Sequence, residues 1–498
     1  MQIRTCNPAK AGFFCFSIPT FFSDGQLKPG FFFYALKKCM KNRHLDQKKC
    51  SKSLVSAPKK CILGKEVAVL ERFAIEKLRA WKDNPRRKPL VLMGARQVGK
   101  TWLMKEFGRK FYKKVAYVSF YNNKAVAKEF ESDYDVKRLL SVLNIASGVT
   151  ITPGDTLIIL DEIQNAPAAF ESLKYFCEDA PEYHVMVAGS LLGVALHNGV
   201  SYPVGKVDLL PLHPLSFREY LCAVGEKPLS DALTSKDYSL ISVFHDKYTQ
   251  HLKNYYYVGG MPGVVEAFRE NYDYQGAREA QKAIIAQYRG DFGKHAGASE
   301  LPKINMVWDS IPVQLAKENR KFFFGKMKKG ARSGEFEVAI QWLVDSGLVH
   351  KVHRVNEPHV PLSAYKDFSV YKLFVLDVGL LSALSELDSQ TILEGNRLFV
   401  EFKGALTEQF VLQQIICETS YTPYYYGTDK ATFEQDFLLQ IGMDAVPVEV
   451  KAETNVRSQS LKAFYDKFHP EKSIRFSLLP YKDQEWMVNI PLYAVCNL

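Results

Sequence analysis

The sequence of 498 residues lacks several features that would place it in a specialised class. It contains no uninterrupted run of about 18 apolar residues, the length that a membrane-spanning helix needs. It also contains no internal repeat and no low-complexity segment. We therefore expect a globular protein of three or four modules without a membrane partner, because single hydrophobic cores stop growing beyond about 300 residues.

Cysteine is scarce as well, with nine residues in the chain. They form no CxxC pair, and no histidine stands near them at the spacing of a zinc site. Free thiols in a reducing compartment are the simplest interpretation of this pattern. We accordingly expect a cytoplasmic protein.

Basic charge is concentrated at the N-terminal end. Residues 1–60 contain twelve Lys and Arg against Asp24 and Asp46, a balance of 12 − 2 = +10, whereas the whole chain carries +11. The rest of the chain is thus not globally basic, and a nucleic-acid surface would have to be a local patch. We predict a basic, disordered leader over residues 1–63. Its apolar run at 11–22 superficially resembles a secretory signal, but a true start at Met40 is the favoured interpretation.

Short apolar segments alternate with helical patterns between residues 64 and 225. The expected strands cover residues 89–93, 115–120, 156–160, 184–188 and 206–210. Continuous apolar runs of this length are typical of strands buried on both faces of a mostly parallel sheet. Their alternation with helices predicts an α/β fold with three layers.

Residues 94–101 (GARQVGKT) fit the phosphate-binding pattern GxxxxGK[ST], and they lie between a predicted strand and an amphipathic helix. Glycines let backbone N–H groups face phosphate oxygens, Lys100 would neutralise the β- and γ-phosphates, and Thr101 would bind Mg²⁺. The sequence therefore predicts a site for ATP. The expected nucleotide-binding residues are Gly94, Ala95, Arg96, Gln97, Val98, Gly99, Lys100, Thr101 and Trp102.

Two acids follow the predicted strand 156–160. We expect Asp161 to hold Mg²⁺ and Glu162 to polarise the attacking water, which favours hydrolysis over phosphate transfer to a small molecule. Ser190 ends the next strand, where ring-type ATPases place a polar residue between these acids and the γ-phosphate. The predicted catalytic residues are Lys100, Glu162 and Ser190.

These motifs, together with residues 211–217 (PLHPLSF), resemble a large microbial group of AAA-type ATPases with a second, poorly characterised C-terminal domain. Residues 259–262 (GGMP) and 404–408 (GALTE) are similar to landmarks of that domain. The resemblance covers residues 65–498 and implies ATP binding and an AAA-like core. One departure bears on assembly: residues 191–205 contain no Arg, so a cooperative ring with an arginine finger is in doubt, with Arg218 as a substitute.

The C-terminal part contains a predicted β-hairpin. Residues 446–451 (VPVEVK) alternate with period two, so their valines share one face. A strand over residues 432–441 precedes them, and Gly442 suits the first position of a two-residue turn. In the register that this turn sets, the numbers of opposed residues sum to 885, which places Asp436 opposite Glu449.

Four residues of this part resemble the site of a restriction-endonuclease-like fold, which we expect for residues 396–498. Asp436 and Glu449 would bind a divalent metal, Lys451 would stabilise an attacking hydroxide, and Glu408 would add a ligand from a helix. A solvated hairpin face is the alternative interpretation. Whether DNA cleavage is retained stays open, because a fold can persist after its catalytic activity is lost.

Residues 304–395 resemble a winged-helix unit, and residues 226–303 are predicted as a helical lid or connector. The basic edge of the winged-helix unit would consist of Lys326, Lys328, Lys329 and Arg332. Such a cluster is usually a solvated face, but beside a nuclease-like domain it could grip the phosphates of DNA.

Three hypotheses follow. In the first, an AAA-type core at residues 64–225 hydrolyses ATP with Mg²⁺ and is coupled to a DNA-contacting, nuclease-like domain. In the second, the protein is a nucleotide-gated switch for a protein partner, with an inactive C-terminal domain. In the third, it is a metal-dependent nuclease that ATP only regulates. The oligomeric state stays open.

Overall fold

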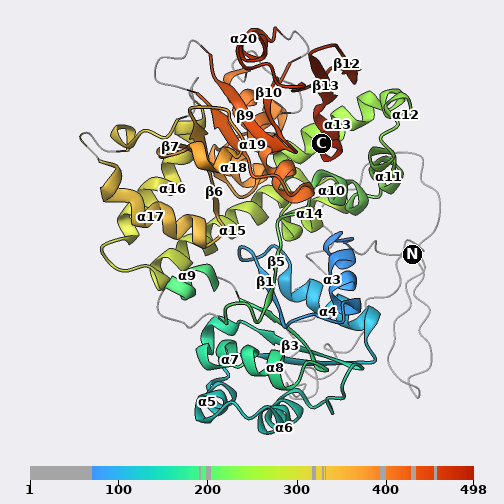
Figure 1. Ribbon diagram of the computed structural model, residues 1–498, viewed down its shortest axis with the longest axis vertical. Helices are drawn as coiled ribbons and strands as arrows, with labels where there is room; N and C mark the ends of the chain where they lie inside the picture. Colours follow the sequence, from blue (N-terminus) through green and yellow to red (C-terminus); the bar gives the residue numbers. More distant parts are fainter. Residues whose placement is uncertain are drawn as a thin grey trace, which may run out of the picture. The chain divides into compact units, whose positions relative to one another are not determined.

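The computed structural model describes residues 70–189, 192–197, 203–316, 321–327, 330, 332–392, 400–427, 433–453 and 457–498 (Figure 1). The predicted leader and Ser190 lie outside these residues. Residues 68–498 form one compact unit. Within the described ranges, no helix has the length and apolar character needed to cross a membrane.

The first sheet has five parallel strands in the order β2-β3-β4-β1-β5. Its strands are β1 (Leu90–Met93), β2 (Lys114–Ser119), β3 (Thr156–Asp161), β4 (His184–Ala188) and β5 (Asp208–Pro211). Strands β3 and β4 are buried along their whole length, as their continuous apolar runs predict. The predicted parallel sheet is confirmed.

Helices cover both faces of this sheet. On β3, Leu157 and Ile159 pack with α3 and α4, whereas Ile158 and Leu160 pack with α5 to α8 on the other side. The predicted three-layer α/β core is confirmed. The helices are α3 (Ala74–Asp83), α4 (Lys100–Phe111), α5 (Lys124–Ser132), α6 (Val136–Ser147), α7 (Pro167–Glu171), α8 (Leu173–Asp179) and α9 (Leu192–His197).

A helical stretch follows the first sheet, in agreement with the sequence pattern. It consists of α10 (Phe217–Ala223), α11 (Lys227–Ser235), α12 (Tyr238–Val243), α13 (His245–Val258), α14 (Pro262–Arg269), α15 (Tyr274–His295), α16 (Leu301–Leu315) and α17 (Ser333–Asp345). The break between α13 and α14 falls at Gly259, whose φ of +75° ends α13. An added Cβ there would lie 2.1 Å from the Asp377 carboxylate, so this position requires glycine.

The second sheet joins regions that the sequence assigns to two modules. Its strand order is β12-β13-β11-β10-β9-β8-β6-β7. The strands are β6 (Val349–Val355), β7 (Lys366–Val375), β8 (Tyr424–Tyr426), β9 (Gln435–Ile441), β10 (Asp444–Val450), β11 (Ser473–Ser477), β12 (Lys482–Asp483) and β13 (Met487–Pro491). Strands β6 and β7 form a hairpin within the predicted winged-helix unit. Because β6 also pairs with β8, this hairpin continues the C-terminal sheet. Periodicity predicts strands but not their partners.

The β9–β10 hairpin has the predicted register. Asp444 pairs with Ile441 and Val448 with Phe437, so the paired numbers sum to 885. Gly442 has a φ of +62°, which suits the first position of the turn. The face that carries Glu449 is not solvated, however. Helix α20 (Gln459–Phe468) packs on it, and Glu449 is only 3% exposed.

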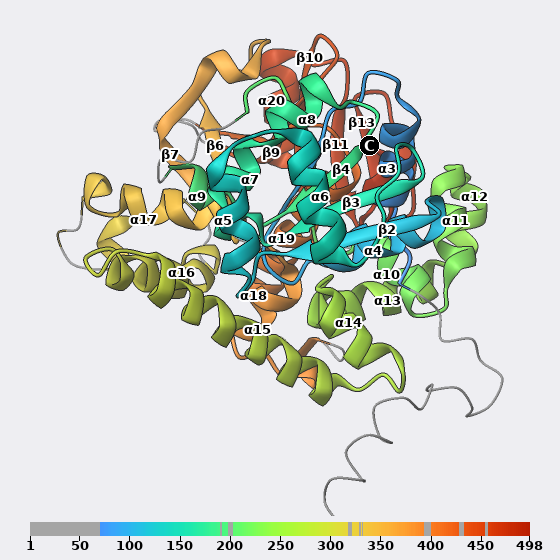
Figure 2. The ribbon, with the colours of Figure 1, turned by 90° about the horizontal axis from the view of Figure 1, so that it is seen from below.

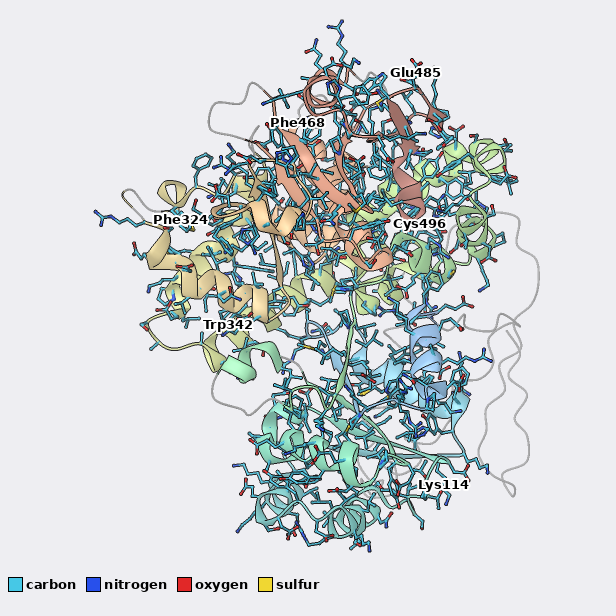
Figure 3. The ribbon with its side chains drawn as sticks, viewed as in Figure 1. Lys114, Phe324, Trp342, Phe468, Glu485 and Cys496 are labelled. Atoms are coloured by element: carbon cyan, nitrogen blue, oxygen red, sulfur yellow. The ribbon has the colours of Figure 1, made fainter. Side chains whose placement is uncertain are left out.

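Two helices complete the C-terminal part, α18 (Val378–Leu384) and α19 (Val400–Glu418). Helix α19 is buried on several sides, including polar positions such as Gln409 and Gln413. These two glutamines bind the backbone of Val375 and Val378, which compensates for their burial. On the other face of the sheet lies Phe468 of α20, which is labelled in Figure 3. Its ring packs against Tyr426.

Candidate nucleotide site

The phosphate loop connects β1 to α4 through backbone conformations that favour glycine. Gly94 has a φ of +150°, and an added Cβ would lie 2.2 Å from the carbonyl oxygen of Leu212. Gly99 has a φ of +94° and directly precedes α4. Gln97 also has a positive φ, +70°, which is uncommon for a residue with a side chain. The loop thus leads straight into a helix N-terminus, where backbone N–H groups favour an anion.

Lys100 lies inside this loop. Its Nζ donates hydrogen bonds of 2.8 Å to the carbonyl oxygens of Gly94 and Ala95. Burial lowers the pKa of Lys100 to about 8, although the nearby charges of Glu162 and Asp161 oppose this shift. The lysine is therefore a poorly solvated cation within the loop.

The predicted metal-binding residues come together at the ends of β3 and α4. Thr101 Oγ1 donates a hydrogen bond of 2.7 Å to Asp161 Oδ2, although 60 positions separate the residues. Tyr117 on β2 donates to the same oxygen at 3.1 Å. Burial and the Asp161 carboxylate raise the pKa of Tyr117 to about 12, so this phenol stays protonated as a donor.

Glu162 sits at a turn directly after β3, with a φ of +53°. Gln164 Nε2 donates a hydrogen bond of 2.6 Å to Glu162 Oε2 and thereby orients the carboxylate. Gly189 at the end of β4 leaves room for this amide, because a Cβ there would lie 2.5 Å from Gln164 Oε1. Sequence reasoning gave Gln164 no role, although it stands two residues after Glu162.

A second residue that sequence reasoning missed is Arg72, which is buried beside the loop. Its guanidinium donates to the carbonyl oxygens of Val98 at 2.7 Å and His213 at 2.6 Å, and it pairs with Glu219 at 3.2 Å. It thus ties the phosphate loop to the chain after β5. Arg72 belongs to no motif, so no signal in the sequence marks it.

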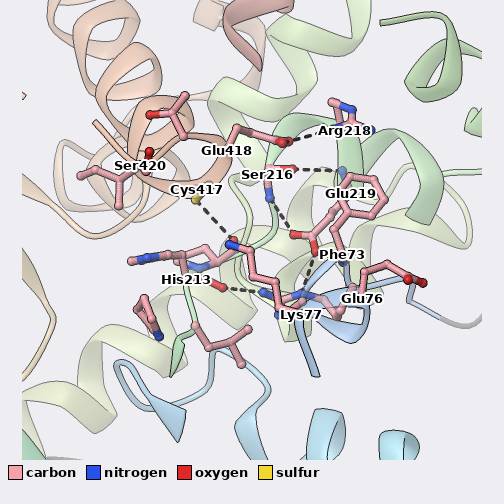
Figure 4. A pocket seen from close by; sticks show the side chains of 17 residues that line it. Phe73, Glu76, Lys77, His213, Ser216, Arg218, Glu219, Cys417, Glu418 and Ser420 are labelled. Atoms are coloured by element: carbon pink, nitrogen blue, oxygen red, sulfur yellow. Dashed lines mark hydrogen bonds and ion pairs between the residues drawn. The ribbon is translucent and has the colours of Figure 1, made fainter. Parts of the chain in front are cut away.

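A cavity of about 560 Å³ lies beside Arg72, between the start of α3 and the end of α19 (Figure 4). Arg218, the predicted substitute for an arginine finger, lines it. Arg218 pairs with Glu418 at 3.2 Å, donates to Thr234 at 2.6 Å and lies 4.6 Å from the ring centre of Phe73. Its guanidinium therefore holds parts of this chain together.

Helix α15 also contacts the phosphate loop. The sequence did not predict this contact. Arg96 forms an ion pair with Asp291, and the side chains of Gln97 and Gln287 are hydrogen-bonded. Tyr288 donates a hydrogen bond of 2.8 Å to the carbonyl oxygen of Arg96. Nearly 200 positions separate these partners, so no local pattern could link them.

The four predicted nuclease residues are brought only partly together. Asp436 Oδ2 accepts a hydrogen bond of 2.7 Å from the N–H of Val450, and Glu449 pairs with Lys451 at 3.1 Å. Glu408 is 1% exposed within α19. No group of three acidic, histidine or cysteine side chains in the described ranges is arranged to hold a metal ion. The nuclease site stays a prediction.

The predicted basic edge is described only at one position. Arg332 is exposed directly before α17, whereas Lys328 and Lys329 and the side chain of Lys326 lie outside the described part of the chain. Helix α17 itself carries Glu335 and Glu337, so its exposed surface is not uniformly basic.

Comparison with known families adds to this geometry. Residues 86–221 match the model of the AAA domain. This segment is an AAA-type ATPase domain. The ATPase domain contains the loop, both acids and all five strands of the first sheet. Residues 249–391 and 403–494 match two domains of unknown function, DUF8612 and DUF4143. None of the curated proteins compared with the chain matches it.

Several solved structures are similar to this chain at low identity. A Walker-type ATPase of Pyrococcus abyssi has 13% identity and a TM-score of 0.42, covering 64% of this chain and 96% of its own. The Orc1 protein of Aeropyrum pernix, in complex with DNA, has 14% identity and a TM-score of 0.26. The match covers 63% of this chain and 90% of the Orc1 chain. AMPPCP-bound DnaA of Aquifex aeolicus has 14% identity and a TM-score of 0.26. The match covers 57% of this chain and 90% of the DnaA chain.

Proposed function

We propose that the ATPase domain hydrolyses ATP with Mg²⁺. The observation that carries this proposal is the 2.7 Å contact between Thr101 Oγ1 and Asp161 Oδ2, with Lys100 in the adjoining loop. Hydroxyl and carboxylate oxygens are the donors that Mg²⁺ prefers, so these two residues fit the ion. A bound Mg²⁺ would neutralise charge on the β- and γ-phosphate oxygens.

The residues of the site have separable roles in this proposal. Lys100 and the loop N–H groups bind the phosphates, and Tyr117 keeps Asp161 in place through its hydrogen bond. Glu162 polarises the attacking water and accepts its proton, while Gln164 fixes the direction of the carboxylate. Ser190, two positions after the end of β4 in the sequence, is proposed to act near the γ-phosphate.

Phosphate release by the wild type and by Glu162→Gln tests this proposal. We expect the variant to bind ATP with unchanged affinity but to turn it over at least ~10-fold more slowly, a barrier increase of about 1.4 kcal/mol. Glu131→Gln is a matched control, because Glu131 is an exposed glutamate on α5 of the same domain. Equal turnover of wild type and Glu162→Gln would remove Glu162 from its role.

We further propose that DNA contacts the C-terminal part, with exposed Arg332 as one contact, and that nuclease chemistry depends on Asp436. Duplex DNA added to the phosphate-release assay should raise turnover if DNA and hydrolysis are coupled. Plasmid nicking with Mg²⁺ or Mn²⁺ that disappears in Asp436→Ala would support cleavage.

One observation favours the nucleotide-gated switch as a second candidate. The phosphate loop is held by α15, outside the ATPase domain, through Arg96 and Gln97. A ligand that alters the loop would act directly on this helix. Slow turnover with a trapped nucleotide, unaffected by DNA, would support the switch.

A further inference from the structure

Helix α15 holds the phosphate loop through one of its faces. Gln287, Tyr288 and Asp291 lie within one turn of each other, since residues three and four apart are neighbours on a helix. Each contacts the loop: Gln287 binds Gln97, Tyr288 binds the carbonyl oxygen of Arg96, and Asp291 pairs with the Arg96 guanidinium. The side chain of Asp291 is 5% exposed, whereas that of Arg96 is 32% exposed. The guanidinium of Arg96 is thus partly accessible to solvent, whereas its acidic partner is buried.

Arg96 is placed to meet a bound nucleotide. It is the third residue of the loop, two positions after Gly94 and four before Lys100. Burial is the main cause of the lowered pKa of Lys100, and the nearby positive charge of Arg96 adds to it. Two cations in one small loop attract an anion. The triphosphate that Lys100 would bind supplies that anion.

Two other arginines near the loop, Arg72 and Arg218, hold parts of the fold together. An arginine finger stabilises the charge that develops during phosphoryl transfer, and it is supplied either by the same chain or by a partner. Residues 191–205 contain no arginine. Arg218 is bound to Glu418 and Thr234, and Arg72 to Glu219 and two carbonyl oxygens. Arg96 is also paired, with Asp291, but unlike these two arginines it is a residue of the phosphate loop itself.

We infer that Arg96 is a catalytic arginine acting within its own chain, and that Asp291 holds it away from the γ-phosphate before nucleotide binds. The inference rests on the proposed hydrolysis. Water attacks the γ-phosphorus and gives a proton to Glu162 while the bond to the β–γ bridging oxygen breaks, yielding ADP and phosphate. Arg96 stabilises the negative charge that develops on the bridging oxygen and the γ-phosphate oxygens, because a guanidinium binds phosphate through two N–H groups.

The same contacts give α15 control over the reaction. Helix α15 lies beside α18 (Figure 2). At this end of α15, Arg278 donates to Ser382 Oγ at 3.0 Å and to the carbonyl oxygen of Leu387 at 2.8 Å. Gln281 donates to the carbonyl oxygen of Val258 at 3.0 Å, directly before the Gly259 break. A shift of α15 that releases Arg96 would therefore change the contacts of α15 with α18 and α13, which lie outside the ATPase domain.

The test compares wild type, Arg96→Ala, Arg96→Lys and Asp291→Asn, with Arg289→Ala on the exposed side of α15 as control. The measurements are kcat, ADP affinity and trapping of ADP with aluminium fluoride, which mimics the transferred phosphoryl group. Arg96→Ala should lower kcat by about 100-fold or more and abolish trapping, while ADP affinity stays within about twofold. Arg96→Lys should have a kcat at least ~10-fold below that of the wild type, because lysine lacks the planar guanidinium with its paired N–H donors.

Asp291→Asn should raise kcat by about threefold or more, because the restraint on Arg96 is weakened. Turnover of Arg96→Ala within threefold of wild type, or intact trapping in that variant, would overturn the inference alone. A drop of Asp291→Asn to the level of Arg96→Ala would show that the ion pair serves only the fold. A wild type that binds ATP but never hydrolyses it would instead overturn the proposed function.

Discussion

Burial of the Lys100 side chain changes its pKa and thereby the charge of the site. Its Nζ contacts two carbonyl oxygens, and burial holds its pKa at about 8, below the ordinary lysine value of 10.5. Below pH 8 the lysine is charged in both the folded and the unfolded chain. Between pH 8 and 10.5 only the unfolded chain binds this proton, so the free energy of unfolding rises with pH in that window.

This shift predicts a pH dependence of ATP binding. A bound triphosphate needs the charged lysine, so binding above pH 8 must first restore its proton. We expect the affinity of the wild type for ATP to fall about tenfold between pH 7 and pH 9, as measured by titration calorimetry. Lys100→Arg stays charged throughout and should lack this fall. A wild-type affinity that is constant across the range would contradict a Lys100 pKa of about 8.

The residues that sequence reasoning found and those it missed differ in the range of their contacts. Lys100, Thr101 and Asp161 stand in short motifs whose spacing reflects one strand–loop–helix unit and the next acid-bearing strand. Arg72 and Asp291 act on the same loop from 26 and 195 positions away. Such contacts depend on how whole helices pack, which residue types and periodicity do not encode.

At the level of elements, the β9–β10 hairpin shows what local sequence can determine. Alternation fixed which residues share a face, and Gly442 fixed the register. The burial of Glu449 was not predictable, because α20 covers that face from a later part of the chain. The pairing of β6 with β8 escaped prediction for the same reason.

Gly442 provides a test at this scale. Its φ of +62° is costly for a β-branched side chain, so Gly442→Val should lower the free energy of unfolding by about 1–2 kcal/mol, as measured by urea denaturation. Met443→Ser is the control, because Met443 is 91% exposed and its replacement should stay within about 0.5 kcal/mol. Equal stability of Gly442→Val and the wild type would argue against this turn.

At the scale of the whole unit, α19 links the second sheet to the ATPase domain. Gln414 accepts a hydrogen bond of 2.7 Å from the N–H of Phe217. Gln413 donates to Asp377 at 2.9 Å and to Tyr255 at 3.0 Å. The ATPase domain and the C-terminal part thus share a buried polar network, and we expect them to unfold together.

Replacing Gln413 with alanine tests this link. The change removes a donor from the buried Asp377 carboxylate and an acceptor from the N–H of Val378, so we expect a loss of about 2–4 kcal/mol. Circular dichroism and the release of a fluorescent nucleotide should report the same midpoint in urea. Ser420→Ala, at an exposed position just after α19, is the control. Two separate transitions in the wild type would contradict the shared network.

The most direct test of a hydrolytic phosphate site is ATP binding and turnover by Lys100→Ala. Lys110→Ala is the matched control, because Lys110 is a half-exposed lysine on the same helix. We predict that Lys100→Ala weakens ATP binding by about 100-fold, ~2.7 kcal/mol, and abolishes turnover, whereas Lys110→Ala behaves like the wild type. Wild-type affinity and turnover in Lys100→Ala would contradict the account.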